Sequence, residues 1–558
     1  ASLTLTLSSH ATGTGRTVTA SADFFTTDHV NTYLKINGKQ GYITARASAT
    51  SATIKILEDM ITTGPHADFE EQLISAERGF PQAVTFHDNR LYFAGVRDAP
   101  AAVVGSQVGG YFNFEVGTGL ADEAINVFVS GDRVNEIRHL VSSRNLQVLT
   151  DGGEYFVPTS TDTSAVTPAN ITFLRQTPYG CSRAKPIIFD GATLYAQKNG
   201  KAVREYLFSD VENAYASTSI SILASHLVND PVDMTMITGT TTRPEQFAFF
   251  TNNDGTLALF HSVRAEKIAG WTLWSTKSGD EFTSITAVNA NLFCVVKRDL
   301  EGGAVYTLAN FAEQDDLTLD CSATTTVNQQ GTPLVNGASQ TGSSLNVDGY
   351  TSAPNTGDVI TIAGVTGSYE IQTVTETASG YTIVLDDDLA SSPADNAAIT
   401  ITSGRVHNSP THLTEETVNA VDGTFSLGEF TTSASDTITF DVAHEAGVDV
   451  GFNYDPSLET MPVDREVSDG PLTGQIKRLS RAVIDLSDTL NVALQAADNT
   501  AKSLVIRQVD FDVASAVEKV TGKKEFFFLG YDRSPTLKIT QTAPLPLKVL
   551  GVALEVVY

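Results

Sequence analysis

Several features that would narrow the function of this sequence are missing from it. It holds three cysteines, Cys181, Cys294 and Cys321, and their odd number and wide spacing argue against a disulfide framework and against a zinc ribbon. No apolar run of about 18 residues or more occurs, so no membrane-spanning helix is predicted. No basic, apolar leader is recognisable at its start, so the sequence predicts no secretion. We therefore expect folding in a reducing cytoplasm.

The common catalytic motifs are also absent. The sequence contains no Gly-x-Ser-x-Gly elbow, no Gly-x-x-x-x-Gly-Lys-Ser/Thr loop and no His-Glu-x-x-His helix. The small residues at 105–110 are better explained as a hairpin turn than as a phosphate-binding loop. We name no catalytic, cofactor-binding or metal-ligating residue, and we expect a protein that is not an enzyme and needs no cofactor.

Acidic residues cluster at three places, 122–123, 315–316 and 386–388. A calcium loop needs acidic oxygens at alternate positions before a glycine and a distal glutamate, and 252–255 is only a fragment of such a loop. We expect all of these stretches to be turns or solvated surface. Paired carboxylates of a glycoside hydrolase remain open, because such residues meet only in space.

For two histidines and two tryptophans we predict whether the side chains bind a ligand or only pack or face solvent. His407 and His412 flank a Ser-Pro pair, which favours a loop with solvated side chains. Trp271 and Trp274 could form a platform on which a sugar stacks. Three positions apart on a strand they point to opposite faces, however, which favours packing in a core and at its rim.

The formal charge is strongly negative, at −29 from 36 basic and 65 acidic residues. Binding to phosphate needs a basic surface, so this balance argues against a protein that coats nucleic acid. One explanation is solubility, for example in a salty habitat. A second explanation follows from the resemblance described below.

One sequence pattern, an apolar run, a polar corner and a second apolar run, recurs along the chain. It is clearest at residues 79–95 and is typical of a tight antiparallel hairpin. Four further copies follow at 137–149, 186–196, 247–260 and 285–296. Their spacing matches the blades of an irregular β-propeller, and the alternative is a set of unrelated hairpins in a large β protein.

The rest of the chain predicts additional small antiparallel β-domains in an all-β fold. Residues 1–65 hold short alternating strands, and 68–78 has helical spacing with Phe69, Leu73 and Ile74 on one side. We assign 66–320 to the propeller repeats. Residues 321–405 are poor in aromatics and form an inserted peripheral β-domain, and 406–558 form a C-terminal β region completing the propeller or a platform. The apolar terminal stretch 544–558 must lie in a sheet, where it could close the propeller.

Several long phrases stand in a fixed order along the sequence: RGFPQAVTF (78–86), NRLYFAG (89–95), VGSQVGGYFNF (104–114), DEAI (122–125), DGGEY (151–155), TPYGC (177–181), AQKNG (196–200), GWTLW (270–274) and TGQIKRLSR (473–481). In these phrases the chain resembles the tail nozzle proteins, also called tail tubular proteins B, of short-tailed bacteriophages. The likeness covers roughly 75–310 and 405–558, whereas the segment before 60 and the segment 320–405 look particular to this chain.

The resemblance implies a structural virion protein, folded in the host cytoplasm and built into the phage tail. It implies a homo-hexameric ring below the portal adaptor, with a channel for genome ejection and a platform for tail fibres. Acidic side chains facing such a channel would repel DNA and let it slide without sequence-specific binding. The competing classes are an extracellular carbohydrate-binding or carbohydrate-cleaving propeller and a β-rich scaffold without a channel.

Overall fold

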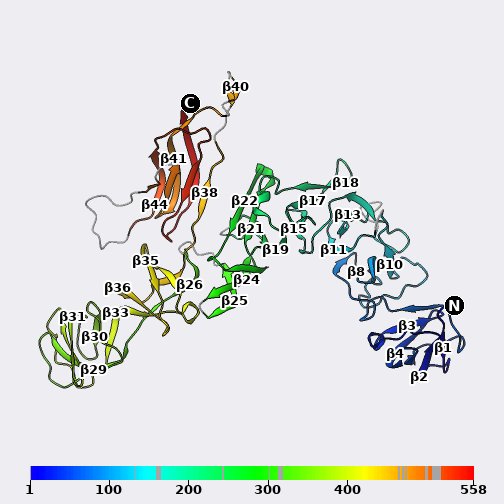
Figure 1. Ribbon diagram of the computed structural model, residues 1–558, viewed down its shortest axis with the longest axis horizontal. Coiled ribbons are helices and arrows are strands. Elements are labelled where there is room, and N and C mark those ends of the chain that lie inside the picture. Colours follow the sequence, from blue (N-terminus) through cyan, green and yellow to red (C-terminus); the bar gives the residue numbers. More distant parts are fainter. Residues whose placement is uncertain are drawn as a thin grey trace. The chain divides into compact units, whose positions relative to one another are not determined.

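The computed structural model describes residues 2–131, 134–158, 165–241, 244–300, 302–311, 318–462, 466–467, 470–471, 474–496, 501–504 and 517–557. Two compact units can be distinguished, one made of 1–274 with 283–290 and one of 275–282 with 291–558. The fold is all-β, an irregular β-propeller with additional small antiparallel domains (Figure 1). The described helices are short 3-10 turns: η1 (Thr27–His29), η2 (Ser225–Leu227), η3 (Arg264–Glu266) and η4 (Thr411–Leu413). None of them is long enough to cross a membrane.

The chain begins with a six-stranded antiparallel sheet of order β1-β2-β5-β4-β3-β6. Its strands are β1 (Leu5–Leu7), β2 (Gly13–Ala20), β3 (Tyr33–Ile36), β4 (Lys39–Ser48), β5 (Ser51–Ile56) and β6 (Phe69–Glu71). Alternate apolar residues, among them Leu5, Val18, Ile43 and Ile54, form its buried core. This sheet extends past residue 65, the predicted end of the N-terminal domain, because β6 pairs with β3.

The helix predicted at 68–78 is wrong. Residues 69–71 form strand β6, which pairs with β3 so that Phe69 lies opposite Ile36. Phe69 packs against the N-terminal core, and a tight turn follows in which Ser75 and Gly79 exchange two backbone hydrogen bonds. Pairing to an existing sheet edge therefore outweighs the helical spacing of three apolar residues.

Four sheets of four strands each follow, and every one is a simple meander of consecutive strands. Their strands are β7 (Ala83–His87), β8 (Arg90–Val96), β9 (Ala99–Gly105) and β10 (Ile125–Phe128); β11 (Ile137–Ser142), β12 (Leu146–Thr150), β13 (Gly153–Phe156) and β14 (Leu174–Thr177); β15 (Ile187–Phe189), β16 (Ala192–Ala196), β17 (Val203–Ser209) and β18 (Ala214–Ser219); and β19 (Pro231–Ile237), β20 (Phe247–Asn252), β21 (Leu257–Val263) and β22 (Ile268–Trp274). We call these sheets blades 1 to 4. A further three-stranded sheet consists of β23 (Glu281–Val288), β24 (Asn291–Leu300) and β25 (Gly303–Phe311).

All five predicted hairpins are confirmed, and local turn chemistry explains several of them. Two-residue turns with both backbones in the left-handed region join β7 to β8 at Asp88-Asn89, β15 to β16 at Asp190-Gly191, and β23 to β24 at Asn289-Ala290. This type I′ geometry matches the right-handed twist of paired strands, and asparagine, aspartate and glycine adopt it at the lowest cost.

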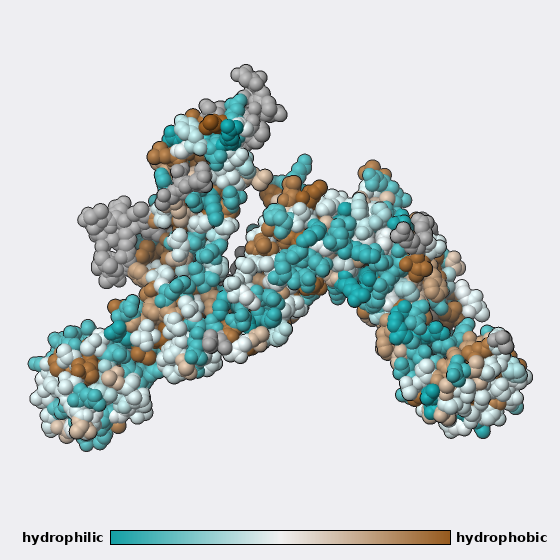
Figure 2. Space-filling model, viewed as in Figure 1, coloured by the Kyte–Doolittle hydropathy of each residue, from teal (hydrophilic) through white to brown (hydrophobic). Residues whose placement is uncertain are grey.

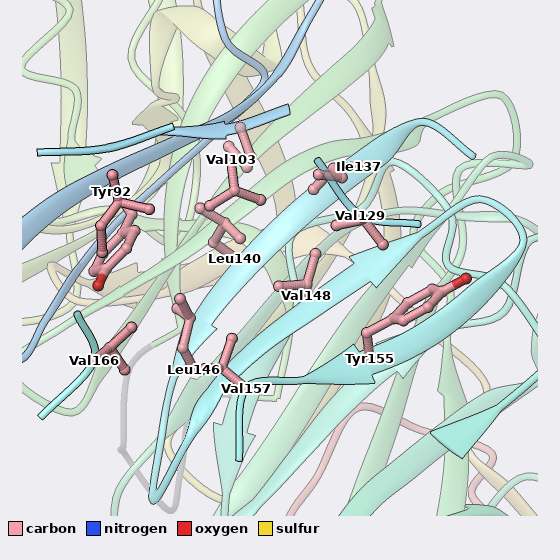
Figure 3. Close-up of a cluster of buried hydrophobic side chains, with 13 residues drawn as sticks. Tyr92, Val103, Val129, Ile137, Leu140, Leu146, Val148, Tyr155, Val157 and Val166 are labelled. Atoms are coloured by element: carbon pink, nitrogen blue, oxygen red, sulfur yellow. The ribbon is translucent and has the colours of Figure 1, made fainter. Parts of the chain in front are cut away.

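Neighbouring blades share hydrophobic cores, which is why some central strands are buried on both faces. On β12, Val148 belongs to a cluster with Tyr92 and Val103 of blade 1 (Figure 3). The next residue, Leu149, belongs to a second cluster with Tyr195 and Tyr206 of blade 3. Blades 3 and 4 are joined in the same way by a cluster that includes Phe189, Leu194, Phe250 and Phe260. Successive blades therefore stack face to face, as in a propeller.

In the second unit, an extended sheet contains the predicted insert. The order β27-β33-β30-β31-β32-β29-β28 has β36 added beside β33. Its strands are β27 (Thr326–Val327), β28 (Gly331–Val335), β29 (Ser344–Tyr350), β30 (Val359–Ile362), β31 (Tyr369–Thr377), β32 (Gly380–Leu385), β33 (Ile399–Asn408) and β36 (Thr437–Glu445). Residues 335–401 supply a separate core that includes Leu345, Ile360 and Ile383.

The other sheets of the second unit are smaller. They are β26 (Asp320–Thr324), β37 (Asp449–Phe452), β34 (Thr417–Asp422) and β35 (Phe425–Thr431); β38 (Ser457–Glu459), β45 (Leu537–Thr540), β42 (Ala493–Ala496) and β43 (Lys502–Ser503); β39 (Glu466–Val467) and β40 (Gly470–Pro471); and β44 (Val520–Phe527), β41 (Arg478–Thr489) and β46 (Val549–Val557).

The terminal apolar stretch is paired, as expected, but it does not close the propeller. Strand β46 pairs with β41, with Val483 opposite Ala553. Among the described strands, that sheet contains only β44, β41 and β46, and no strand of blades 1 to 4. The correction follows from pairing, because β41, a long strand of the same unit, satisfies the backbone of β46. The four-part domain division stays a prediction.

Candidate interaction surface

A buried arginine organises a long loop of blade 1. Arg90 follows the β7–β8 turn, and its side chain is completely buried. One terminal nitrogen, Nη1, donates to the carbonyl oxygens of Ser106 at 2.7 Å and Glu123 at 2.6 Å. The other, Nη2, donates to the carbonyl oxygen of Ala121 at 2.6 Å. These bonds offset the desolvation of the cation and fix both ends of the segment 106–124.

The same loop is also held by its own side chains. The Glu123 carboxylate accepts hydrogen bonds from the amides of Leu120 at 2.7 Å and Gly119 at 2.6 Å, and the pKa of this carboxyl is lowered. Asn113 donates to the Gln107 side chain at 2.9 Å. Glu115 accepts from Gln40 of the N-terminal sheet at 2.8 Å. Side-chain hydrogen bonds therefore hold the loop at several points, although it has little regular structure.

This firm loop and strand β7 present apolar side chains to solvent. Val84 and Phe86 lie on the same face of β7, and both are exposed. The Tyr111 ring packs edge-on against Phe86, with the ring centroids 5.3 Å apart. Phe112 beside it is 97% exposed. We call Val84, Phe86, Tyr111 and Phe112 the first-blade surface, and Figure 2 shows apolar side chains over the part of the molecule where Figure 1 labels β8 and β10.

A second exposed apolar surface lies on the C-terminal sheet, in a groove of about 630 Å³. Phe527 and Leu529 line it and are largely exposed, while Phe528 is buried. Its other lining residues are Arg478, Ser480, Arg481, Lys502 and Glu555. We call it the C-terminal groove.

The groove differs from the first-blade surface in its charge. Arg481 pairs with two carboxylates, Glu555 at 3.0 Å and Glu525 at 3.5 Å. The other two cations contact carbonyl oxygens and a ring. Arg478 donates to the carbonyl of Phe528 at 3.2 Å. Lys502 donates to the carbonyl of Phe527 and lies 5.3 Å from the Phe528 ring. The groove therefore combines apolar walls with positive charge.

The predicted insert lacks such surfaces. Among the described residues, no large hydrophobic side chain between Leu308 and Val442 is exposed. Isolated exposed apolar residues are ordinary, but a cluster of them marks an interaction site. The candidate interaction surfaces thus lie on either side of the insert in sequence.

The stretches that the sequence analysis assigned to turns are turns wherever they are described. Residues 105–110 end β9 and turn back, with the Gly110 amide bonded to Gln107. Residues 252–255 form the β20–β21 turn, and Asp254 accepts from Thr256. Residues 386–388 are exposed, and 315–316 lie outside the described residues. No group of three or more potential metal ligands occurs in the described part of the chain.

The two tryptophans pack on opposite faces of β22, as predicted. The Trp271 ring lies 4.9 Å from Phe260, and its nitrogen donates to the carbonyl of Ile220 at 3.0 Å. Trp274 packs edge-on against Phe249, with the centroids 5.9 Å apart. They do not form a common platform on which a sugar could stack.

The prediction for His407 is wrong, whereas His412 is exposed as expected, in the short helix η4. His407 lies on β33 and is completely buried. Its ring contacts Thr325 Oγ1 at 2.9 Å and the carbonyl of His444 at 3.0 Å. Burial lowers the pKa of the imidazole. Strand β33 continues to residue 408, so His407 lies inside it. The Ser-Pro pair that follows had suggested a loop instead.

Comparison with known proteins identifies the family. The model of the bacteriophage nozzle protein family matches residues 81–395, which is more than half of the chain. This chain belongs to the bacteriophage nozzle protein family. It is therefore a structural component of a phage tail. The match starts directly before β7, so the Arg90 loop and the first-blade surface lie within the family region.

The matched range bears on two expectations. Residues 321–395, which looked particular to this chain, fall within the nozzle family match, so that expectation is wrong. The region 405–558, where a likeness was expected, lies beyond the match, and its likeness stays a prediction.

Other comparisons add little. No curated protein matches this chain. The solved structures that resemble this nozzle-family chain include Raptor from Chaetomium thermophilum, with a TM-score of 0.28 and 10% identity. The alignment covers 56% of this chain and 30% of Raptor. They also include a Trypanosoma rangeli sialidase, with a TM-score of 0.27, 11% identity and coverage of 99% of this chain and 90% of the sialidase.

Proposed function

We propose that six copies of this chain form the nozzle ring below the portal adaptor, around a channel through which the genome leaves. Membership of the nozzle family is the observation that carries this proposal. A closed ring needs two different contact faces on each subunit, because each copy meets its neighbours head to tail. The first-blade surface and the C-terminal groove supply two such faces of different chemistry.

The negative charge suits passage of DNA rather than binding of DNA. With −29 on each copy, acidic side chains along a ring channel repel phosphates and keep the duplex from adhering. Tail fibres would dock on the outside of the ring. The protein performs no catalysis in this role, and the packed tryptophans remove the aromatic platform that a carbohydrate-binding propeller would need.

The mass of the purified protein in solution tests the assembly. A sedimentation or native mass measurement should give a species six times the chain mass of 59.5 kDa. A species of one chain mass at all concentrations up to those in an infected cell would overturn the ring. Retention of duplex DNA by the assembled ring at low salt would overturn the repelling channel, because electrostatic binding is strongest there.

A further inference from the structure

We propose that Phe112 of one copy inserts into the C-terminal groove of the neighbouring copy, so that the first-blade surface and the groove are the two halves of the ring interface. The inference rests on the proposed function, because it assigns the contact that closes the ring. The occupant of the groove is thus a second copy of this chain.

Because a closed ring needs two unlike contact faces, few surfaces of the chain can be the partner of the C-terminal groove. A head-to-tail ring joins a patch on one subunit to a different patch on the next, and both must bury substantial apolar area. Among the described residues, the large exposed hydrophobic side chains lie at or before Leu308 and at or after Val442. The insert between them offers no such anchor, so the partner of the C-terminal groove lies outside the insert.

Charge complementarity selects the first blade. No lysine or arginine occurs from Asp98 to residue 132, a stretch that contains Glu115, Asp122 and Glu123. Glu115 pairs with Lys35 of the N-terminal sheet, so the acidic character of this face rests on Asp122 and Glu123. The groove is lined by Arg478, Arg481 and Lys502. Copies that each carry −29 repel one another on average, so a basic face opposite an acidic one lowers the cost of bringing them together.

The shape of the two surfaces agrees with this pairing. Phe112 stands almost fully in solvent on a loop whose two ends are fixed by Arg90, so less backbone entropy remains to be lost when it docks. The groove offers Phe527 and Leu529 as exposed apolar walls beside cationic side chains. A rigid aromatic anchor entering an apolar pocket with a polar rim is the usual centre of a protein interface.

Cysteine cross-linking tests the contact directly. The variant Phe112→Cys with Leu529→Cys, in a Cys321→Ser background that leaves only the buried Cys181 and Cys294, should form disulfide-linked multimers on mild oxidation. In the matched control the first cysteine is placed at Val211 and Phe112 is kept. Val211 is also 97% exposed, but it lies on the β17–β18 turn of blade 3. The Val211→Cys with Leu529→Cys chain should form rings without cross-links.

Each outcome is decisive. Rings that do not cross-link through residues 112 and 529 would overturn this interface and leave the ring itself standing, and they would indicate that the groove takes another protein. Unassembled chains from the unmodified protein would overturn the proposed function as well. In addition, Phe112→Ser should raise the dissociation constant of the ring by about 30-fold, as for an interface hot spot, whereas Val211→Ser should leave it unchanged.

Discussion

The Arg90 guanidinium donates a 2.6 Å hydrogen bond to the carbonyl oxygen of Ala121, across 31 positions of the sequence. The same side chain also binds the carbonyls of Ser106 and Glu123. A single cation thus replaces the regular pairing that the loop lacks. The exposure of Phe112 on a firm base depends on this relationship.

Replacing Arg90 by leucine should loosen the loop. The substitution leaves three carbonyl groups without their donor, at a cost of about 3 kcal/mol or more. Hydrogen exchange followed by mass spectrometry should show faster exchange of amides in 106–124. The control is Arg97→Leu on the same blade, where a 62% exposed side chain pairs with Asp98 and where the loss should stay below about 1 kcal/mol. Equal exchange in the two variants would contradict the role given to Arg90.

A buried acid between blades 2 and 3 should make stability depend on pH. Glu154 is completely buried, and burial raises the pKa of its carboxyl above 4.5. The folded protein therefore keeps this proton to a higher pH than the unfolded chain does, and stability falls as the pH rises from about 4.5 through the folded pKa. Glu154→Gln, which can still accept from Thr177 and the Tyr179 amide, should remove this part of the decline.

Thermal unfolding of both proteins between pH 4.5 and pH 8 measures that difference. The Glu154→Gln protein should gain stability relative to the parent as the pH rises. A parallel decline in both proteins would show that Glu154 does not carry a raised pKa.

The second unit should respond to acid in the opposite direction. Arg298 is almost fully buried and binds Asp320 through two hydrogen bonds, at 2.7 and 2.9 Å, and Asp280 at 2.9 Å. Burial acts to raise the pKa of Asp320, but the hydrogen bonds and charge of Arg298 outweigh it and lower that pKa. The ion pair therefore contributes stability above about pH 3.8, which is lost as the pH falls through the lower folded value.

Arg298→Met leaves two carboxylates together without a cation, which should cost about 3 to 5 kcal/mol at neutral pH. Acid unfolding of the second unit, followed by circular dichroism, should then begin at a higher pH than in the parent. The neighbouring Lys297→Met provides the control, because its pair with Glu281 is partly exposed at 3.2 Å and should contribute less than about 1 kcal/mol. An unchanged acid midpoint in Arg298→Met would refute the assignment.

Removing the insert should leave the ring intact. Strands β27 and β33 place Val327 opposite His407, so residues 329–404 leave and return at neighbouring points and can be replaced by a short glycine-rich turn. The deleted part has its own core and no large exposed hydrophobic side chain in the described residues. Light scattering after size exclusion should still show hexamers, and monomers would place the insert in the interface.

The hairpins were predictable because their information is local. Each turn is written in two or three residues, as at Asp88-Asn89 and Asp190-Gly191, and the flanking strands alternate in polarity. The alternation of side chains along a strand likewise predicted that Trp271 and Trp274 point to opposite faces. Such features depend only on residues a few positions apart, so they can be predicted from a single sequence.

The missed features depend on distant parts of the chain. Phe69 and the apolar residues after it have the spacing of a helix, but residues 69–71 pair with the edge of β3 instead. His407 is buried by contacts with Thr325 and His444. Arg90 looks like a solvated residue beside a turn, and only the return of the loop near Ala121 buries it. An aromatic run at 111–114 without a nearby basic residue was the one signal of the exposed surface.

Averaged electron micrographs of the purified, full-length chain test the central claim most directly. The account predicts a ring with six-fold symmetry and an open centre, in which blade 1 of each copy touches the C-terminal sheet of the next. Single chains, or open filaments without a closed channel, would contradict it.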